Sequence, residues 1–273
     1  MDIMRKFRPT VAIPVFDGTY SEIKPCPELA PYICCFWTSA GDSRSLVIPD
    51  TCMDLIFRID HVKRSADVDF CTVDERGYRT EPRGLSADRY SIFGIRFYAW
   101  TAVLFTDCGF SDCHDQSAGE LFSGLYDEAE PLFYENRSTA EITERVSELL
   151  LSRLDRDRSD STIMNSVRVI IDTNSVISTA ELAERSAVSR RQLERIFMRN
   201  IGVSPKSFTS LMRYQMLWQD ICGGNRDFLA LTEKYGFCDQ AHMINDFRKR
   251  HTMSPGQALE LINKSHFYNT NKT

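Results

Sequence analysis

Two stretches in the C-terminal part of this 273-residue chain repeat one pattern of side chains about 50 residues apart, and this duplication limits the fold more than any other feature. A period of this length indicates one structural unit used twice. Both copies end in Ser-Pro, which is typical of a new helix that begins at the proline. The aligned pairs are Leu182 and Leu231, Ala187 and Gly236, Phe197 and Phe247, Arg199 and Lys249, and Ser204-Pro205 and Ser254-Pro255.

Each copy is predicted to fold as a short helix, a turn and a longer helix. Ser178 opens a capping-box pattern in front of the first short helix. The turn between two steeply crossing helices needs a small residue, which Ala187 and Gly236 supply. The pattern therefore predicts two helix-turn-helix motifs joined by a long helix. The predicted ranges are about 178–201 for the first motif, 205–222 for the linker helix and about 226–251 for the second motif.

The longer helix of each unit is predicted to have one apolar and one polar face. In the first unit Leu193 and Phe197 point inward, and Arg191, Arg195 and Arg199, spaced by four, lie on the other side. Such a row can be a solvated helix face. A DNA major groove, however, admits one α-helix, whose Arg side chains read guanine and whose Asn or Gln side chains read adenine. We therefore predict base and phosphate contacts. The matching polar residues of the second unit are Gln240, Ala241, Asn245 and Lys249.

The net charge of -5 hides an uneven distribution along the chain. Residues 1–159 hold 18 Lys+Arg against 27 Asp+Glu, whereas residues 160–273 hold 15 against 11. Charge asymmetry between two halves points to nucleic-acid contact by the basic half. The predicted partner is therefore double-stranded DNA at a promoter or operator, with RNA polymerase and a second copy of the chain as further candidates.

The first half reads mainly as β-strands. Five segments rich in Ile, Val, Phe, Trp and Tyr are separated by Gly, Pro, Asp and Ser clusters, which predicts a β-barrel or jelly-roll-like domain. The segments are Ile33–Thr38, Leu46–Ile48, Met53–Ile59, Val68–Val73 and Tyr90–Thr106.

Helices are predicted to follow the strands near 117–154, one of them opened by a capping box at Ser138. The charged run 155–160 lacks apolar anchors and is the predicted domain boundary. The predicted fold class is therefore α+β with two domains. A sensory or interaction domain covers 1–158, and an all-α DNA-binding domain covers 159–265.

From 161 to about 261 the sequence resembles the DNA-binding domain of the AraC/XylS family of bacterial transcription regulators. The resemblance rests on LAERSAVSRRQLERIF, GVSP, YGFCDQAHM and FRKRHTMSP. It implies a seven-helix domain whose two helix-turn-helix motifs are joined by a long central helix. The residues that it implies to face bases are Arg190, Arg191, Glu194 and Arg195 in the first unit, and Gln240, Ala241, His242 and Asn245 in the second.

Three positions depart from the family's pattern. Ala187 stands where the first turn usually has Gly. Cys238 replaces a Ser at the start of the second reading helix, so a weaker helix cap is expected there. Ile244-Asn245 replaces a Ser-Arg pair, so this helix is expected to grip the DNA backbone or to read an adenine. In the first half, PELAPYICCFW, VIPDTCMDLIF and GIRF resemble the N-terminal β-domain of a less characterised group of AraC-type regulators.

The leading hypothesis for the N-terminal domain is a pocket for a small-molecule effector, because a small β-barrel can enclose one ligand. The alternative is that its aromatic residues are core and its charges surface. The candidate pocket residues are Trp37, Asp54, Arg96, Tyr98 and Trp100.

Three other functions would use other features of this domain. A cupin-type metalloenzyme needs several His, and only His61 and His114 are present. A protein-interaction domain would use the apolar stripe 142–150. A thiol sensor would use some of Cys26, Cys34, Cys35, Cys52, Cys71, Cys108 and Cys113. The regulator assignment predicts no enzyme activity, no cofactor and no metal site.

The nine cysteines are predicted to be reduced thiols, because the chain shows neither an apolar export signal nor a run of about 18 apolar residues that would span a membrane. The predicted location is the cytoplasm. Cys108, Cys113 and His114 offer three metal ligands without a fourth, so unrelated side chains in a loop are expected.

Overall fold

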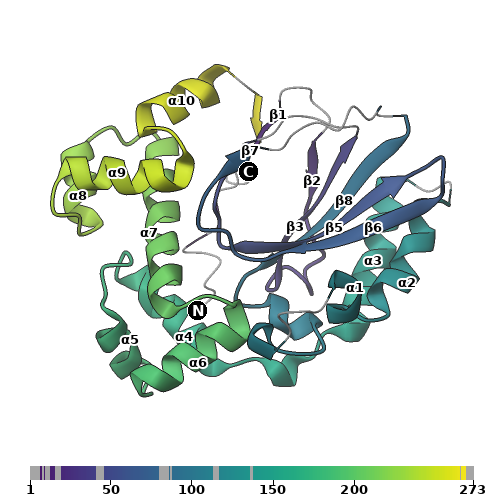
Figure 1. The fold of residues 1–273 in the computed structure, drawn as a ribbon, viewed down its shortest axis with the longest axis horizontal. Helices are drawn as coiled ribbons and strands as arrows, with labels where there is room; N and C mark the ends of the chain where they lie inside the picture. The colour runs from purple at the N-terminus through teal and green to yellow at the C-terminus, as the bar shows by residue number, and fades with distance from the viewer. Residues whose placement is uncertain are drawn as a thin grey trace.

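In the computed structural model, a β-rich N-terminal domain is followed by a helical C-terminal domain (Figure 1), which confirms the predicted α+β two-domain fold. The structure describes residues 7, 9, 13–15, 20–40, 46–79, 86, 88–112, 117–135, 138–264 and 266–268. The strands are β1 (Ile13–Val15), β2 (Ser21–Ile23), β3 (Ile33–Ala40), β4 (Leu46–Val47), β5 (Cys52–Asp60), β6 (Ser65–Cys71), β7 (Tyr78–Arg79), β8 (Tyr90–Tyr98) and β9 (His266–Tyr268). The helices are η2 (Ala102–Phe105), η3 (Phe110–Asp112), α1 (Ala118–Leu121), α2 (Leu125–Ala129), η4 (Glu130–Phe133), α3 (Thr139–Arg153), η5 (Arg156–Arg158), α4 (Ser161–Asp172), α5 (Thr179–Arg185), α6 (Arg190–Ile201), α7 (Pro205–Cys222), α8 (Phe228–Lys234), α9 (Gln240–His251) and α10 (Pro255–Lys264).

The main sheet is antiparallel, with the strand order β2-β3-β8-β5-β6. Two small ribbons pair β4 with β7 and β1 with β9. Among the described strands, these pairings leave the main sheet open and do not close it into a barrel. The long run predicted to end at Thr106 leaves the sheet at Tyr98, because the apolar residues after it form the buried 3-10 helix η2.

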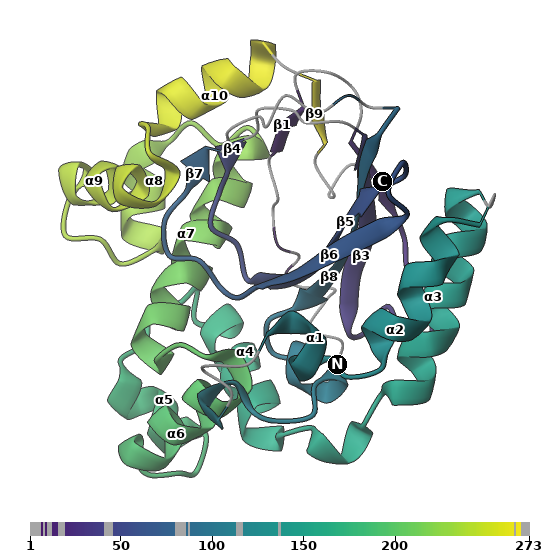
Figure 2. The ribbon, with the colours of Figure 1, turned by 45° about the vertical axis from the view of Figure 1, so that its right-hand side comes forward.

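The two faces of the sheet differ in chemistry, as the period-two alternation of a strand allows. One face is apolar and covered by α1, α2 and α3 (Figure 2). There Phe57 stacks on Tyr126 and packs on Phe133, with ring centroids 6.4 and 5.1 Å away. Val146 on the predicted stripe of α3 is buried in this same core, so this part of the stripe packs within its own domain. The other face carries Trp37, Asp54 and Arg96.

The helical domain contains two helix-turn-helix units, α5 with α6 and α8 with α9, at the two ends of the 18-residue helix α7 (Figure 1). The side chain of Ser204 accepts a hydrogen bond from the backbone N–H of Ser207, and Pro205 follows as the first helical residue. Pro at that position is preorganised for a helix. The start of α7 therefore follows from local sequence.

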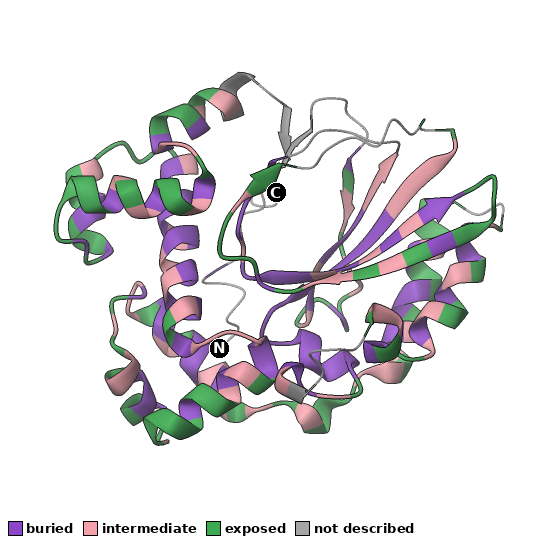
Figure 3. Cartoon of the chain, viewed as in Figure 1, coloured by how far each residue is buried: buried purple, intermediate pink, exposed green. Residues whose placement is uncertain are grey.

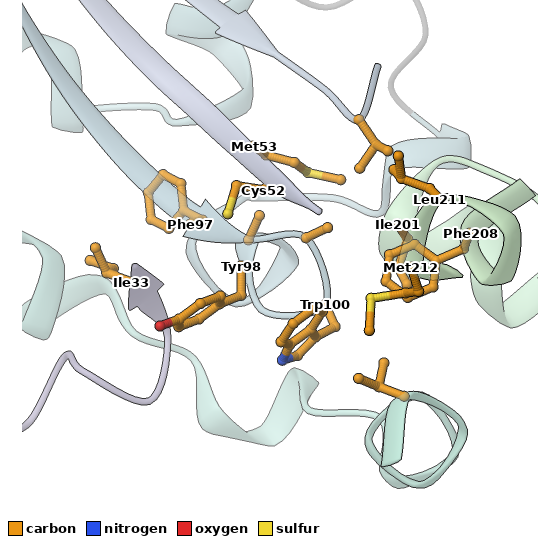
Figure 4. Close-up of a cluster of buried hydrophobic side chains, with 14 of the residues drawn as sticks. Ile33, Cys52, Met53, Phe97, Tyr98, Trp100, Ile201, Phe208, Leu211 and Met212 are labelled. Atoms are coloured by element: carbon orange, nitrogen blue, oxygen red, sulfur yellow. The ribbon is translucent and has the colours of Figure 1, made fainter. Parts of the chain in front are cut away.

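One continuous hydrophobic core runs through both domains. Figure 4 shows where they meet, with Cys52, Met53 and Trp100 of the N-terminal domain near Ile201, Phe208, Leu211 and Met212 of the helical domain. Trp100 and Phe208 make an edge-to-face contact at 6.3 Å. Both rings are buried. The interface is therefore built like a core and fixes the two domains against each other.

Within the described ranges, no helix combines the length and apolar character that a membrane span needs.

Candidate DNA-binding interface

Helix α6 is held by one buried stripe and leaves its polar face open to solvent (Figure 3). Leu193, Phe197 and Ile201 are fully buried. Ser189 caps the helix, its side chain accepting a hydrogen bond from the backbone N–H of Gln192 at 3.2 Å. All four residues expected to face bases from this unit are exposed, namely Arg190, Arg191, Glu194 and Arg195.

Arg199 is also exposed, but it lies at the C-terminal end of α6, next to the N-terminal domain. A Cβ placed on Gly109 of the N-terminal domain would come within 2.5 Å of the Arg199 Cγ and 3.1 Å of its carbonyl oxygen. The end of α6 therefore rests on the segment that leads into η3. Burial lowers the pKa of Arg158, and the nearby charge of Arg199 lowers it further. Arg199 thus sits at the seam between the domains.

Helix α9 repeats this design. Met243 and Phe247 are fully buried. The structure corrects the expectation of a weak cap at Cys238, because the capping residue is Asp239, whose carboxylate accepts a hydrogen bond from the backbone N–H of His242 at 2.6 Å. A charged acceptor at a helix N-terminus is favoured by the helix dipole. The predicted contact residues of this unit are all exposed, namely Gln240, Ala241, His242, Asn245 and Lys249.

The core beneath α9 contains a buried histidine that the sequence did not reveal. The His251 ring stacks on Phe247 at 4.7 Å and packs on Trp218 at 4.6 Å. Its Nδ1 lies 2.7 Å from the Tyr214 hydroxyl. Burial lowers the pKa of His251 to about 3. The ring is therefore neutral near pH 7 and serves packing.

Both turns use a left-handed residue at the same place in the repeat. The backbone φ angle is 56° at Ala187 and 65° at Gly236. A Cβ on Gly236 would lie 2.9 Å from Cγ1 of Val176, in the segment between α4 and α5. The second turn therefore packs directly against the first half of the helical domain, which helps to fix one unit relative to the other.

Arg250 is a functional candidate that the sequence analysis missed. Its Nη2 donates a hydrogen bond to Ser210 Oγ at 2.8 Å, and its Nη1 donates to the carbonyl oxygen of Glu75 at 3.4 Å. The backbone N–H of Gly77 donates to the Arg250 carbonyl oxygen at 2.7 Å. The contacts with Glu75 and Gly77 tie the end of α9 to the N-terminal domain, and the contact with Ser210 ties it to α7. No local pattern indicates the contact with Glu75, because Glu75 and Arg250 are 175 residues apart.

On the polar face of the sheet, three of the five predicted effector residues form one network. Trp37 Nε1 donates a hydrogen bond to Asp54 Oδ1 at 2.7 Å, and Arg96 Nε donates to the same oxygen at 3.0 Å. The Arg96 guanidinium also lies 5.9 Å from the Trp37 ring centre. Gly94 lies directly beneath the indole, and any Cβ there would overlap the ring. A side chain at that position would prevent Trp37 from reaching Asp54.

The other two predicted effector residues lie toward the domain interface. Tyr98 stacks on Trp100 with ring centroids 5.3 Å apart, and Trp100 faces α7. Near the network, burial raises the pKa of Asp50 to about 7, while the positive charge of Arg96 opposes the rise. The Asp50 carboxylate accepts a hydrogen bond from the backbone N–H of Cys52 at 2.7 Å.

The cysteines correct one expectation. Seven of them are free thiols, but Cys108 is disulfide-bonded, so the prediction of reduced thiols is wrong at that position. Cys113 and His114 lie outside the described residues.

Hydrogen bonds with Cys35 and Cys52 lower the pKa of the Cys34 thiol. Neighbouring side chains of a regular strand point to opposite faces. The bulge between Ile33 and Cys35 disturbs this alternation, so the thiols of Cys34 and Cys35 can meet. In the described part of the chain, no group of three His, Cys, Asp or Glu side chains could hold a metal ion.

Comparison with known proteins gives two domain matches. Residues 21–118 match a domain of unknown function, DUF6597, and residues 182–260 match a helix-turn-helix domain. An uncharacterized HTH-type transcriptional regulator from Haemophilus influenzae is 31% identical over 77 residues, which are 28% of this chain and 26% of that protein. The chain therefore spans about a quarter of the length of this relative.

Solved structures give remote likenesses. The C-terminal domain of the response regulator yesN from Fusobacterium nucleatum has 20% identity and a TM-score of 0.33, over 36% of this chain and 97% of that one. ToxT from Vibrio cholerae O395 has 9% identity and a TM-score of 0.40, over 90% and 99%. ToxT of strain SCE256 with an unsaturated fatty acid bound has 11% identity and a TM-score of 0.39, over 94% and 97%. Residues 182–260 are therefore an AraC-type helix-turn-helix domain, and this domain follows a DUF6597 domain in the chain.

Proposed function

We propose that the chain is a sequence-specific DNA-binding transcription regulator that reads DNA with α6 and α9. The observation that carries this proposal is the exposed polar face at the start of both helices. Within the described ranges, Arg190, Arg191 and Arg195 form no ion pair. Arginines without acidic partners remain available to guanine edges or to phosphates.

The spacing of the two units supports the same proposal. Helix α7 has 18 residues, so it is roughly 27 Å long at about 1.5 Å per residue. Successive major-groove segments on one side of a duplex are about 34 Å apart. Two helices held near the ends of such a rod can enter neighbouring major grooves, so one chain would read a site of two parts.

The test is selection of binding sequences from randomised duplexes, followed by affinity measurements at one stated salt concentration. Arg195→Ala is expected to weaken binding to the selected duplex about 5- to 150-fold, because one base contact contributes roughly 1–3 kcal/mol. Binding to random competitor should weaken much less.

Arg145→Ala is the matched control, since it removes the same charge from an exposed helix of the N-terminal domain. It should leave both affinities nearly unchanged. Equal losses on selected and random DNA for Arg195→Ala would reassign that residue to phosphate. A wild-type protein that selects no sequence would contradict the proposed function itself.

A small-molecule effector on the polar face of the sheet is the second part of the proposal. Its support is Arg96, whose Nη1 is buried and has no hydrogen-bond partner among the described residues. A buried donor without an acceptor is unfavourable, so an oxygen of a ligand would satisfy it. Ligand binding would act by shifting a population between DNA-competent and incompetent arrangements.

Thermal unfolding with a panel of small carboxylic acids and carbonyl compounds tests this second part. At least one compound is expected to raise the Tm of the wild-type protein, because a ligand that binds only the folded state stabilises it. The same compound should raise the Tm of Arg96→Lys much less. Equal stabilisation of both proteins, or no stabilising compound, would reject an effector site at Arg96.

A further inference from the structure

Two glycines of the N-terminal domain lie against the C-terminal ends of the two reading helices. A Cβ on Gly109 would meet Arg199 of α6, at 2.5 Å from Cγ and 3.1 Å from the carbonyl oxygen. A Cβ on Gly77 would lie 3.0 Å from the carbonyl oxygen of Arg250 in α9 and 2.9 Å from that of Val47. Both approaches are closer than a side chain allows without a shift of its neighbours.

The two contacts fall at matching places in the repeat. Arg199 aligns with Lys249, so Arg250 follows the equivalent position by one residue. At the first contact, the positive-φ residue Gly202, which ends α6, faces Phe110 of η3. In Figures 1 and 2, β7 lies beside α9, at the end of α7 that is away from α6. The N-terminal domain therefore touches each reading helix at the same end.

The middle of the linker helix is held as well. The side chain of Gln215 in α7 is fully buried, and its Nε2 donates a hydrogen bond to the carbonyl oxygen of Pro49 at 2.6 Å. Near the start of the same helix, the Trp100 ring meets Phe208, which also packs on Phe197 of α6. These contacts thus hold α6, α7 and α9 against the N-terminal domain.

These contacts leave the DNA-reading ends free. Recognition helices contact bases mainly with their N-terminal residues, and here Arg190, Arg191, Gln240 and His242 are exposed. The N-terminal domain grips the opposite end of each helix. Its contact therefore does not block the groove-reading surface. What it constrains is the distance and rotation between the two helices.

We propose that Gly77 and Gly109 form a two-point clamp through which the N-terminal domain sets the spacing of the two reading helices, and so selects the length of DNA between the two parts of the binding site. The proposal rests on the proposed DNA-binding function. It makes both glycines specificity-determining positions, although neither touches DNA. Without the clamp, the two units would be held together by α7 and by the packing of Val176 against the turn at Gly236.

The experiment uses the full chain and two variants. Gly77→Ala and Gly109→Ala, combined in one protein, insert a methyl group at both contacts. Gly119→Ala is the matched control, because a Cβ there meets nothing within 4 Å. The probes are duplexes that carry a sequence selected with the wild-type protein, with one or two base pairs inserted between or deleted from its two halves.

The wild-type protein and the control are expected to lose at least about tenfold in affinity per changed base pair, the loss of a mismatched contact. The double variant should lose less than about threefold, while its affinity for a duplex with one half-site stays within about twofold of wild type. A double variant with the wild-type spacing profile would overturn the clamp.

Hydrogen exchange separates this proposal from the proposed function and does not depend on a folded variant. The Gly77 amide donates to Arg250 at 2.7 Å, so it should exchange slowly in the wild-type protein without DNA. Exchange at the rate of an open loop would also overturn the clamp. If the wild-type protein selects no DNA sequence while Gly77 is protected, the proposed function fails and the clamp stands as an interdomain contact.

Discussion

Asp54→Ala is expected to lower the free energy of unfolding by about 3–5 kcal/mol, the usual cost of breaking a buried ion pair from one side. The Arg96 side chain is 5% exposed and the Asp54 side chain 14% exposed. Removing the carboxylate leaves the guanidinium buried with no counter-ion at 3.0 Å and also removes the acceptor of the Trp37 indole N–H. Urea unfolding followed by circular dichroism measures the loss.

Two further variants make this result specific. Glu148→Ala breaks the exposed pair with Arg145, in which both side chains are more than half exposed, and should cost less than about 1 kcal/mol. Asp54→Asn keeps an acceptor for Trp37 and should lie between wild type and Asp54→Ala. An Asp54→Ala protein as stable as the Glu148→Ala protein would show that solvent reaches Arg96.

Gly236→Ala is the second change with a large expected effect, a loss of about 2 kcal/mol. A residue with a Cβ in the left-handed region costs roughly 1–2 kcal/mol, and the new methyl group would also press on Val176 at 2.9 Å. Thermal or urea unfolding measures the loss. Because the clash is with the end of a half-exposed valine, most of the cost comes from the backbone.

The duplicated turn provides the reciprocal control. Ala187 already has a positive φ of 56°, so Ala187→Gly relieves strain and is expected to stabilise the protein by about 0.5 kcal/mol. Opposite signs at the two equivalent positions are the expected pattern. If Ala187→Gly destabilised the protein as much as Gly236→Ala, backbone conformation would not explain either change.

Much of the helical domain could be predicted because its determinants are local. The predicted range 205–222 is that of α7, since a serine cap and Pro205 mark its start and the Gly pair at 223–224 marks its end. The exposed face of α6 follows from the 3.6-residue period of Leu193 and Phe197. The cap of α9 lies at Asp239, one residue after the Cys238 at which the family pattern places it.

The strands of the N-terminal domain could be predicted from the sequence. The open sheet and the hydrogen-bond network on its polar face could not. Strand alternation indicates which residues share a face, yet the strand order that puts β8 between β3 and β5 comes from pairings across the chain. Only that order brings Trp37, Asp54 and Arg96 together. The same limit applies to Tyr98 and Trp100: their composition suits the same pocket, but Tyr98 ends β8 and Trp100 follows it, away from the network.

The sequence by itself determined the duplicated helix-turn-helix pattern, the limits of its helices and the polar residues on their exposed faces, because caps, turns and helical periodicity depend on residues a few positions apart. Only the tertiary structure decided that the N-terminal domain meets both reading helices, that Arg199 and Arg250 lie at the domain seam and that Arg96 is buried. Those facts depend on contacts between segments up to about 175 residues apart. Such contacts form because two apolar surfaces are buried against each other, and no short-range pattern encodes them.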